Sequence, residues 1–371
     1  MGGLLVVVLL AVAIVWLLNP PAAAPDGEVS ARWAKTGPHE VIEEDIQLRD
    51  ESRPTQPNGE FEGKPARQLE GRLWRPKHRG ASPLVFYSHG FMSSHRGGED
   101  IGRFLASHGY ITVAVDFPLT NGDAPGGPLV TDVINQPQDA TFVIDKLLKR
   151  SADEDDPLFG QIDPDRIGAA GLSLGGMTTQ LIAFHPHVAD PRINAALSIA
   201  GPTSHFTARF FEHRDIPFLM LAGGSDAIVP YADNALPILD KVPEATLVTL
   251  ENASHTGFAA QAAGLFRFAD HPDELVCPRL LDNLEAPDEA GEATLLEPNP
   301  DIGIVESSSL PCQVDEFPRA MRPPKQVMYT RLVTYGFFES IFAETRDRRE
   351  AARTFLTQTL PQENPVVGVR P

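Results

Sequence analysis

Basic residues and cysteine are scarce in this chain of 371 residues, which holds 31 Lys or Arg against 50 Asp or Glu and only two Cys. The formal net charge of −19 leaves no positive excess to neutralise phosphates, so nucleic-acid binding is not expected. Internal repeats are also absent from the sequence. What is present is a hydrophobic fraction of 42%, enough to bury a sizeable core in one large domain or in two smaller ones.

Much of the negative charge is local. Between Asp270 and Ala320 the chain carries 13 Asp or Glu and two Arg, Arg279 and Arg319. This composition favours a solvated acidic insertion at about residues 265–325. Metal binding is the alternative, but the carboxylates lack the spacing that an EF-hand loop requires.

Both cysteines, Cys277 and Cys312, fall inside this insertion. We predict that they form a disulfide, which would stabilise a loop of about 35 residues by roughly 3–4 kcal/mol in the chain-entropy picture. The alternative is two unrelated free thiols. Neither cysteine has a basic neighbour that would suggest a nucleophile.

The amino terminus contains an apolar run of 15 residues, LLVVVLLAVAIVWLL (4–18). Its length predicts a signal peptide or a short membrane anchor within residues 1–24, followed by a linker over 25–40. No Lys or Arg precedes the run, and Pro25 follows the small residues that a signal peptidase would need, so cleavage and retention both remain open. Either way we expect an exported protein that is periplasmic, secreted or anchored to the outer face of a membrane.

From residue 41 onward the pattern predicts an α/β fold. Short apolar runs such as PLVFYSHG (83–90) and YITVAVDFP (110–118) alternate with helical segments such as 98–109 and 135–150. This alternation predicts a mostly parallel central sheet with helices on both faces. Residues 41–48 and 67–76 alternate partly and predict antiparallel strands at the N-terminal edge of the sheet. After residue 325, two helices are expected to close the domain.

One stretch, RIGAAGLSLGGMTTQLIAF (166–184), combines a strand, a glycine-rich turn and a helix. The pattern Gly171-x-Ser173-x-Gly175 is typical of a sharp strand-to-helix turn that raises a serine hydroxyl above the carboxyl ends of the strands. A serine placed there can attack a carbonyl carbon, with main-chain N–H groups beside the developing oxyanion.

A serine hydroxyl needs a base, and the base needs an orienting acid. Asp226 follows the apolar run FLMLAGG, and His255 follows the run LVTL, so the chain order Ser, Asp, His fits this fold. The N–H groups of Phe91 and Leu174 are the predicted oxyanion donors.

Three basic residues lie in or near the loop that carries Phe91, and other roles are expected for them. His89 is expected to shape the loop by hydrogen bonding rather than to act as a second base. His95 and Arg96 read as surface residues, with contact to an anionic substrate as the alternative.

The segments FYSHGF, QPQDATFVIDKL, GLSLGG, GGSDAIVP and SHTGF resemble those of the α/β-hydrolase superfamily. The most similar branch is that of the dienelactone-hydrolase-like and platelet-activating-factor-acetylhydrolase-like serine esterases, with polyester-degrading hydrolases in a neighbouring branch. The resemblance covers roughly residues 65–260 and the final helices. It implies Ser173 as nucleophile, Asp226 as acid, His255 as base, and no metal or organic cofactor. Dienelactone hydrolases proper carry cysteine where this chain has Ser173, and the insertion departs from their compact pattern.

The expected function is hydrolysis of a small-molecule, lipid or polymer ester through an acyl-enzyme. Acyl transfer or amide hydrolysis on the same triad is one alternative, and a non-catalytic binding protein of the same fold is another. Membrane attachment, if present, would run through residues 4–18, and the acidic insertion could serve as a lid.

Overall fold

A computed structural model describes residues 23–371 of the chain, except 79, 285–293 and 308. The predicted segment 4–18 therefore lies outside the described residues. Among the helices within that described range, none is long and apolar enough to cross a membrane.

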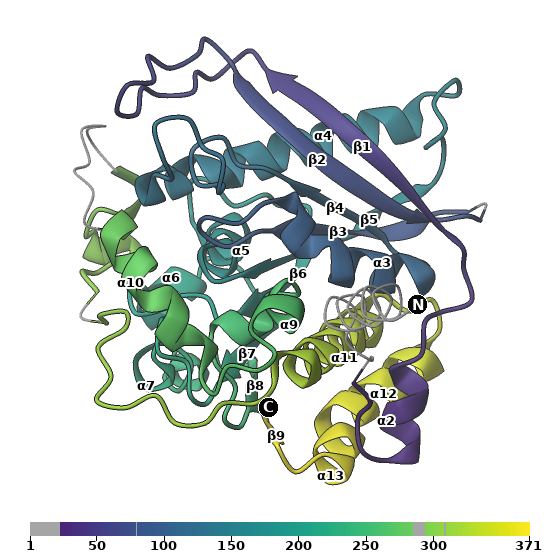
Figure 1. Ribbon diagram of the computed structural model, residues 1–371. Helices are drawn as coiled ribbons and strands as arrows, with labels where there is room; N and C mark the ends of the chain where they lie inside the picture. Colours follow the sequence, from purple (N-terminus) through teal and green to yellow (C-terminus); the bar gives the residue numbers. More distant parts are fainter. Residues whose placement is uncertain (1–22, 79, 285–293, 308) are drawn as a thin grey trace, which may run out of the picture.

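Nine strands form one sheet in the order β1-β2-β4-β3-β5-β6-β7-β8-β9 (Figure 1). The pairings from β4 through β8 are all parallel, whereas β1, β2 and β9 are added at the two edges in antiparallel orientation. The strands are β1 Val41–Asp50, β2 Arg67–Pro76, β3 Ser82–Ser88, β4 Ile111–Val115, β5 Ile162–Leu172, β6 Ile193–Ile199, β7 Phe218–Gly223, β8 Thr246–Leu250 and β9 Val367–Arg370. The predicted mostly parallel sheet with an antiparallel N-terminal edge is confirmed.

Helices cover both faces of the sheet (Figure 1). The longer ones are α3 Glu99–Ser107, α4 Gln136–Ala152, α5 Leu174–Phe184, α10 Pro272–Leu284, α11 Pro323–Phe342 and α12 Arg346–Thr354. Shorter ones are α2 Glu28–Trp33, α6 Ala208–Phe211, α7 Tyr231–Asn234, α8 Ile238–Lys241, α9 Ala262–Leu265 and α13 Leu360–Glu363.

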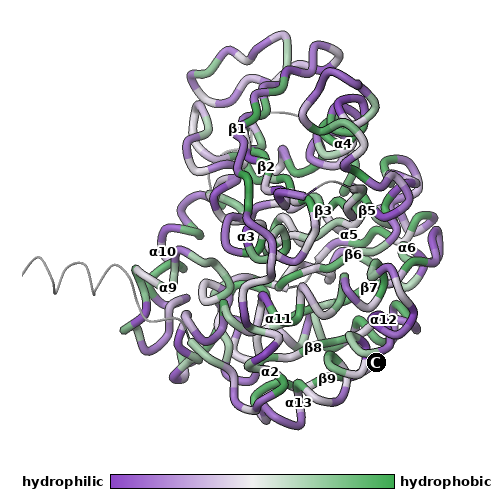
Figure 2. Tube along the Cα trace, turned by 90° about the vertical axis from the view of Figure 1, so that its right-hand side faces the viewer, coloured by the Kyte–Doolittle hydropathy of each residue, from purple (hydrophilic) through white to green (hydrophobic). Residues whose placement is uncertain are grey.

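Each face of the sheet has its own apolar core. One core packs α4 and α5 on the sheet, and the other packs α3 and α11 on the opposite face. Because the central strands are covered on both sides, they read as continuous apolar runs, as in β3, where every residue is buried. Figure 2 shows these strands in green inside a mostly purple periphery.

The predicted linker over residues 25–40 is wrong in part. Glu28–Trp33 forms the helix α2, and the Trp33 ring stacks on Phe355 with centroids 4.2 Å apart. Glu363 accepts hydrogen bonds from the amides of Val29 and Ser30. A composition rich in Pro, Ala and Gly does not indicate this helix, because the residues that stabilise it lie near the carboxyl terminus of the chain.

A buried ion-pair network attaches the start of β2 to α4. Arg67 is fully buried, and its guanidinium lies 2.9 Å from Asp132 and 2.6 Å from Asp139. Arg53 also binds Asp139, at 2.6 Å. Both acids therefore depend on arginine partners for compensation of their charge in a site that water does not reach.

Replacing Arg67 by Met should lower the free energy of unfolding by about 3–5 kcal/mol, because it leaves buried carboxylates without their main partner. Urea denaturation would measure the change. The matched control is Lys77→Met, which removes an exposed pair with Glu40 at 2.9 Å and should change stability by less than about 1 kcal/mol. Equal effects of the two variants would contradict this account.

Candidate active site

Ser173 lies at the sharp turn between β5 and α5, as the sequence predicts. Its φ of 57° and ψ of −120° fall in a region that side chains other than glycine rarely adopt. The Ser173 amide donates to the Ile199 carbonyl at 2.8 Å, and its own carbonyl accepts from Met177 at 3.1 Å. The strained backbone is therefore held from both the sheet and the helix.

The two flanking glycines are required by close backbone approach. A Cβ at Gly171 would overlap the carbonyl group of Gly175, and a Cβ at Gly175 would overlap the carbonyl group of Ser88. Any larger residue at either position would separate the first turn of α5 from β3 and β5. The glycines thus let the helix begin directly under the serine.

Asp226 and His255 are brought together from the loops after β7 and β8. His255 Nδ1 lies 2.8 Å from Asp226 Oδ2, and both side chains are buried. The other carboxylate oxygen accepts from the amides of Ile228 at 2.9 Å and Val229 at 2.7 Å. With Nδ1 engaged by the acid, Nε2 is the ring nitrogen left for chemistry.

The electrostatics of this pair favour a protonated imidazole. Burial alone would lower the pKa of His255, but the charge and hydrogen bond of Asp226, together with the charge of Asp273, outweigh it. The pKa of His255 is therefore raised above its ordinary value of 6.5. This arrangement stabilises the imidazolium that a general base forms when it accepts a proton.

Ser173 and His255 line the same cavity of about 410 Å³. No hydrogen bond joins the Ser173 hydroxyl to the imidazole among the described residues. Such contacts are often long in enzymes without substrate and shorten in the complex. The structure thus places all three predicted side chains at the carboxyl ends of the parallel strands, with one direct bond between them.

The two predicted oxyanion donors flank the serine. Leu174 opens α5, and an amide in the first turn of a helix has no intrahelical acceptor. Phe91 lies in the loop after β3 and lines the cavity beside Ser173.

The loop that carries Phe91 is shaped by His89, as predicted. His89 Nε2 accepts from the amide of Phe117 at 3.1 Å, and Nδ1 donates to the Gly90 carbonyl at 2.8 Å. Burial lowers the pKa of His89, which fits this neutral, fully hydrogen-bonded ring.

Asp273 is a site residue that the sequence reading missed. It belongs to the acidic insertion, where solvated carboxylates are expected, but it is completely buried at the start of α10. Its Oδ2 accepts from the amides of Ala227 at 3.1 Å and His255 at 2.9 Å, and its Oδ1 accepts from Thr256 at 2.7 Å. One carboxylate therefore holds together the loop of Asp226 and the loop of His255.

The predicted disulfide between Cys277 and Cys312 is confirmed, with an S–S distance of 2.02 Å. Cys277 lies one turn after Asp273 on α10, and the Cys312 amide donates to the Ala227 carbonyl at 2.6 Å. The Cys312 end of the bridge is therefore bonded to the loop that carries Asp226, and the Cys277 end lies on the helix whose Asp273 bonds to the same loop. Within the described residues, no three His, Cys, Asp or Glu side chains gather in a way that could hold a metal ion.

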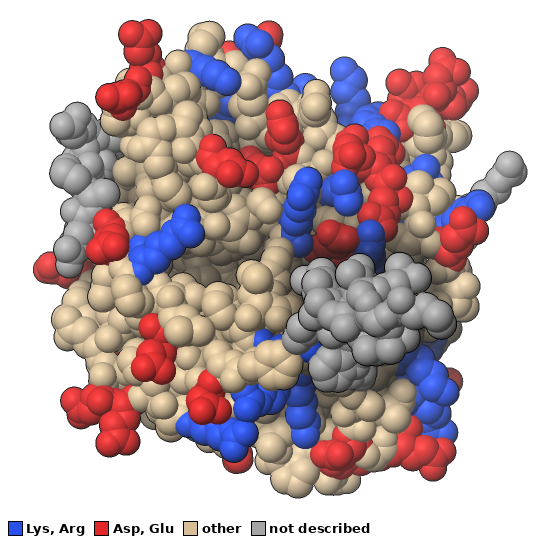
Figure 3. Space-filling model, in the orientation of Figure 1, with Lys and Arg blue, Asp and Glu red and all other residues tan. Residues whose placement is uncertain are grey.

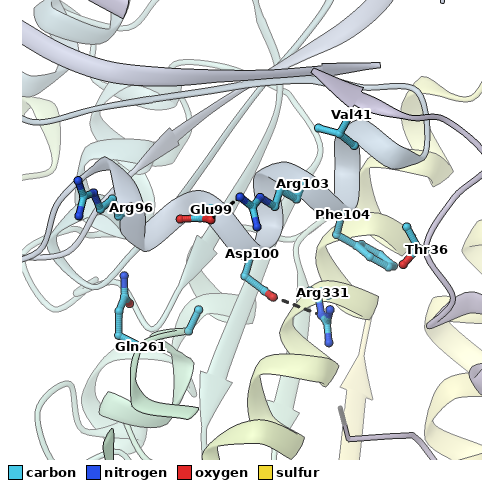
Figure 4. A pocket seen from close by; sticks show the side chains of 10 residues that line it. Thr36, Val41, Arg96, Glu99, Asp100, Arg103, Phe104, Gln261 and Arg331 are labelled. Atoms are coloured by element: carbon cyan, nitrogen blue, oxygen red, sulfur yellow. Dashed lines mark ion pairs between the residues drawn. The ribbon is translucent and has the colours of Figure 1, made fainter. Parts of the chain in front are cut away.

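A separate, more polar cavity of about 560 Å³ lies between α3 and α11. Asp100 pairs with Arg331 at 3.4 Å and Glu99 with Arg103 at 2.8 Å (Figure 4). It contains none of the predicted catalytic residues.

Arg96 lines this polar cavity and does not line the one beside Ser173. His95 pairs with Asp116 at 3.0 Å. Neither basic residue lines the cavity that contains Ser173 and His255.

The sheet order, the strained serine turn and the placement of the acid and histidine loops define a protein of the α/β-hydrolase class. The model of the PET hydrolase-like family matches residues 70–269, more than half of the chain. The chain belongs to this family. This membership confirms the predicted superfamily and the prediction of a carboxylic ester hydrolase.

Three curated proteins are similar to the chain over most of its length. Cutinase 1 of Thermobifida cellulosilytica is 22% identical over 72% of this chain and 95% of its own. The cutinase of Thermobifida fusca (strain YX) is 22% identical over 72% and 82%, and cutinase est1 of Thermobifida alba is 23% identical over 64% and 70%. At these identities the relatives support the assignment without fixing the substrate.

Replacing Asp273 by Ala should lower kcat/KM for a short ester about 10-fold or more, because three amides, two of them buried, lose a charged acceptor and both loops lose their anchor. The acid limb of the pH profile should also move to lower pH, since the Asp273 charge raises the pKa of His255. Steady-state kinetics from pH 5 to 9 would measure both effects.

The matched control is Asp282→Ala, which removes an exposed carboxylate from the same helix and should change neither quantity. A loss of activity in Asp273→Ala with an unshifted pH profile would show that Asp273 acts on folding alone.

Proposed function

We propose that the protein is a serine esterase in which Ser173 is the nucleophile, His255 the general base and Asp226 the orienting acid. The observation that carries this proposal is the convergence of a strained serine and a buried His255–Asp226 pair on one cavity. Strain of this kind persists only when the surrounding structure enforces it, and it gathers at functional sites. The intact constellation argues against a binding protein that merely kept the fold.

In the proposed first step, Ser173 Oγ bonds to the ester carbonyl carbon while its proton passes to His255 Nε2. The carbonyl oxygen becomes an oxyanion, for which the N–H groups of Phe91 and Leu174 are the donors. The bond to the alkoxy oxygen then breaks, and His255 returns the proton to the departing alcohol.

The second step releases the acid. Water attacks the acyl carbon, its proton passes to His255, and the same proton reaches Ser173 Oγ as the acid departs. Asp226 stays ionised throughout and stabilises the imidazolium. Each oxyanion donor is worth about 2.7–4 kcal/mol in such a transition state.

We also propose that the protein is exported and acts on esters outside the cytoplasm. The disulfide supports export, because such bonds persist in oxidising compartments. The relatives are named cutinases and the family is PET hydrolase-like, which brings polymer esters into consideration beside small-molecule and lipid esters.

Replacing Ser173 by Ala should abolish turnover of p-nitrophenyl acetate and covalent labelling by a fluorophosphonate probe, both of which the wild type should show. Mass spectrometry of the labelled peptide would locate the adduct. Labelling of the wild type at a different residue, or undiminished turnover in Ser173→Ala, would overturn the assignment. Adding an alcohol as a competing acceptor would separate hydrolysis from acyl transfer.

The rate should fall with decreasing pH as His255 becomes protonated. Because the pKa of His255 is raised above 6.5, kcat/KM should reach its maximum only at pH values above that pKa and should decline below it. A pH–rate profile without an acid limb near neutrality would contradict the role of His255.

Replacing Asp226 by Asn should lower kcat by about 10³–10⁴-fold, since the wrong imidazole tautomer would then be favoured.

A further inference from the structure

The candidate oxyanion donors come from two different segments of the fold. Phe91 lies in the loop after β3, whereas Leu174 opens α5. For two N–H groups to act on one oxygen atom, their positions must be fixed to within about half an ångström. The pairing of β3 with β5 aligns the two segments only as far as Ser88 and Gly171, so the parts beyond the sheet need contacts of their own.

The loop of Phe91 is hydrogen-bonded to the loop that follows β4. The Met92 amide donates to the Thr120 carbonyl at 2.9 Å, and the Gly122 amide donates to the Ser93 carbonyl at 2.8 Å. Met92 has a φ of 61°, in the left-handed region that side chains rarely adopt. These bonds therefore hold a strained backbone directly after Phe91.

A polar network connects Thr120 with the first turn of α5. Gln136 Nε2 donates to Thr120 Oγ1 at 2.8 Å. Gln136 Oε1 accepts from the Thr178 hydroxyl, which also lies 3.1 Å from the Leu174 carbonyl oxygen. These three side chains, Thr120, Gln136 and Thr178, are called the Gln136 network below. One amide side chain thus links, bond by bond, the segments that carry Phe91 and Leu174.

The Gln136 network lies in the interior of the protein. Thr120, Gln136 and Thr178 are each 0% exposed. All three are uncharged, whereas the Lys, Arg, Asp and Glu side chains in Figure 3 are spread over the surface. Loss of one partner in such a place leaves a buried polar group unpaired, which is costly, so the network favours a single arrangement of its members.

Gln136 is itself fixed at the start of α4. On the same turn, Asp139 lies 2.6 Å from Arg67 and 2.6 Å from Arg53, which attaches this end of α4 to β2 and the loop before it. Gln136 also opens the segment QPQDATFVIDKL, which carries part of the resemblance to α/β-hydrolases but contains no member of the triad. A role in the active site for this segment is therefore still to be assigned.

We infer that Gln136 and Thr178 are positioning residues for the oxyanion hole. They hold the N–H groups of Phe91 and Leu174 at the separation that the tetrahedral intermediate requires. This inference rests on the proposed function and deepens it. Neither Gln136 nor Thr178 lines the cavity that contains Ser173, so each acts through the backbone that it holds.

Two adjacent threonines of α5 offer a matched test. Thr178 and Thr179 are both fully buried, and each hydroxyl lies near the carbonyl oxygen four residues earlier, at 3.1 Å and 2.9 Å. Of the two, only Thr178 bonds to Gln136. Because Val has nearly the shape of Thr without its hydroxyl, Thr178→Val removes the link to Gln136, and Thr179→Val removes a local bond alone. Thr178→Ser keeps the hydroxyl and tests for rescue.

Thr178→Val should lower kcat and kcat/KM for p-nitrophenyl acetate about 10-fold or more and leave KM within about threefold. The reason is that a displaced oxyanion donor loses stabilisation only in the transition state. Thr179→Val and Thr178→Ser should both stay within about threefold of the wild type. The acid limb of the pH profile should not move in any of these variants, because the Gln136 network makes no bond to His255.

A second measurement reports on the oxyanion hole directly. Hexyl trifluoromethyl ketone inhibits serine esterases by adduct formation: the serine Oγ bonds to the carbonyl carbon, the carbonyl oxygen becomes an oxyanion, and the hydroxyl proton passes to the imidazole. Its inhibition constant should rise in Thr178→Val by about the factor by which kcat/KM falls, and it should not change in Thr179→Val.

Three results would overturn the inference. They are equal losses of kcat/KM in Thr178→Val and Thr179→Val, wild-type kcat/KM in a folded Thr178→Val, and an inhibition constant that does not follow kcat/KM. A shifted acid limb would also overturn it, since the residue would then act through His255. Circular dichroism checks folding. If Thr178→Val does not fold, Gln136→Met, which keeps the length of the side chain and removes its amide, takes its place with the same expected results.

Failure of the proposed function gives a different result. In that case the wild type would not hydrolyse p-nitrophenyl acetate, or Ser173→Ala would hydrolyse it undiminished, and the inference would fall with it. A wrong inference about Gln136 and Thr178 leaves wild-type turnover and its dependence on Ser173 intact.

Discussion

The close approach of the first turn of α5 to the ends of β3 and β5 is the constraint on which the site depends. It forces Ser173 to a φ of 57° and leaves no room for a Cβ at Gly171 or Gly175. The two apolar cores stabilise this contact by packing α5 on one face of the sheet and α11 on the other. The strain at one residue is thus balanced by burial spread over the whole domain.

The insertion of about residues 265–325 contributes residues to the candidate active site. Asp273 holds the loops of Asp226 and His255, Cys312 bonds to the loop after β7, and α10 borders the cavity at Ser173. A segment that reads as a charged surface appendage therefore contributes the anchor of the candidate base and the walls around the candidate nucleophile. Its disulfide stabilises these roles by limiting how far the segment can depart from the sheet.

Sequence patterns predicted the parallel strands well, because strands buried on both faces must be continuously apolar. They did not predict β9 or the helix α2. Each is short, and each is stabilised by partners more than a hundred residues away, such as β8 for Val367–Arg370 and Glu363 for Ser30. Asp273 was missed for a similar reason. The segment around it has the composition of an exposed acidic loop, and only the fold surrounds its carboxylate with amide donors.

The sequence by itself determined the strained turn, the order Ser173, Asp226, His255 and the cysteine pair, because glycine spacing and apolar runs are local consequences of sterics and burial. Only the tertiary structure decided that Asp226 lies 2.8 Å from His255, that Asp273 joins their loops, and that Ser173 and His255 line one cavity. These features arise where loops from distant strands meet. Their geometry depends on how whole elements pack, which no local pattern records.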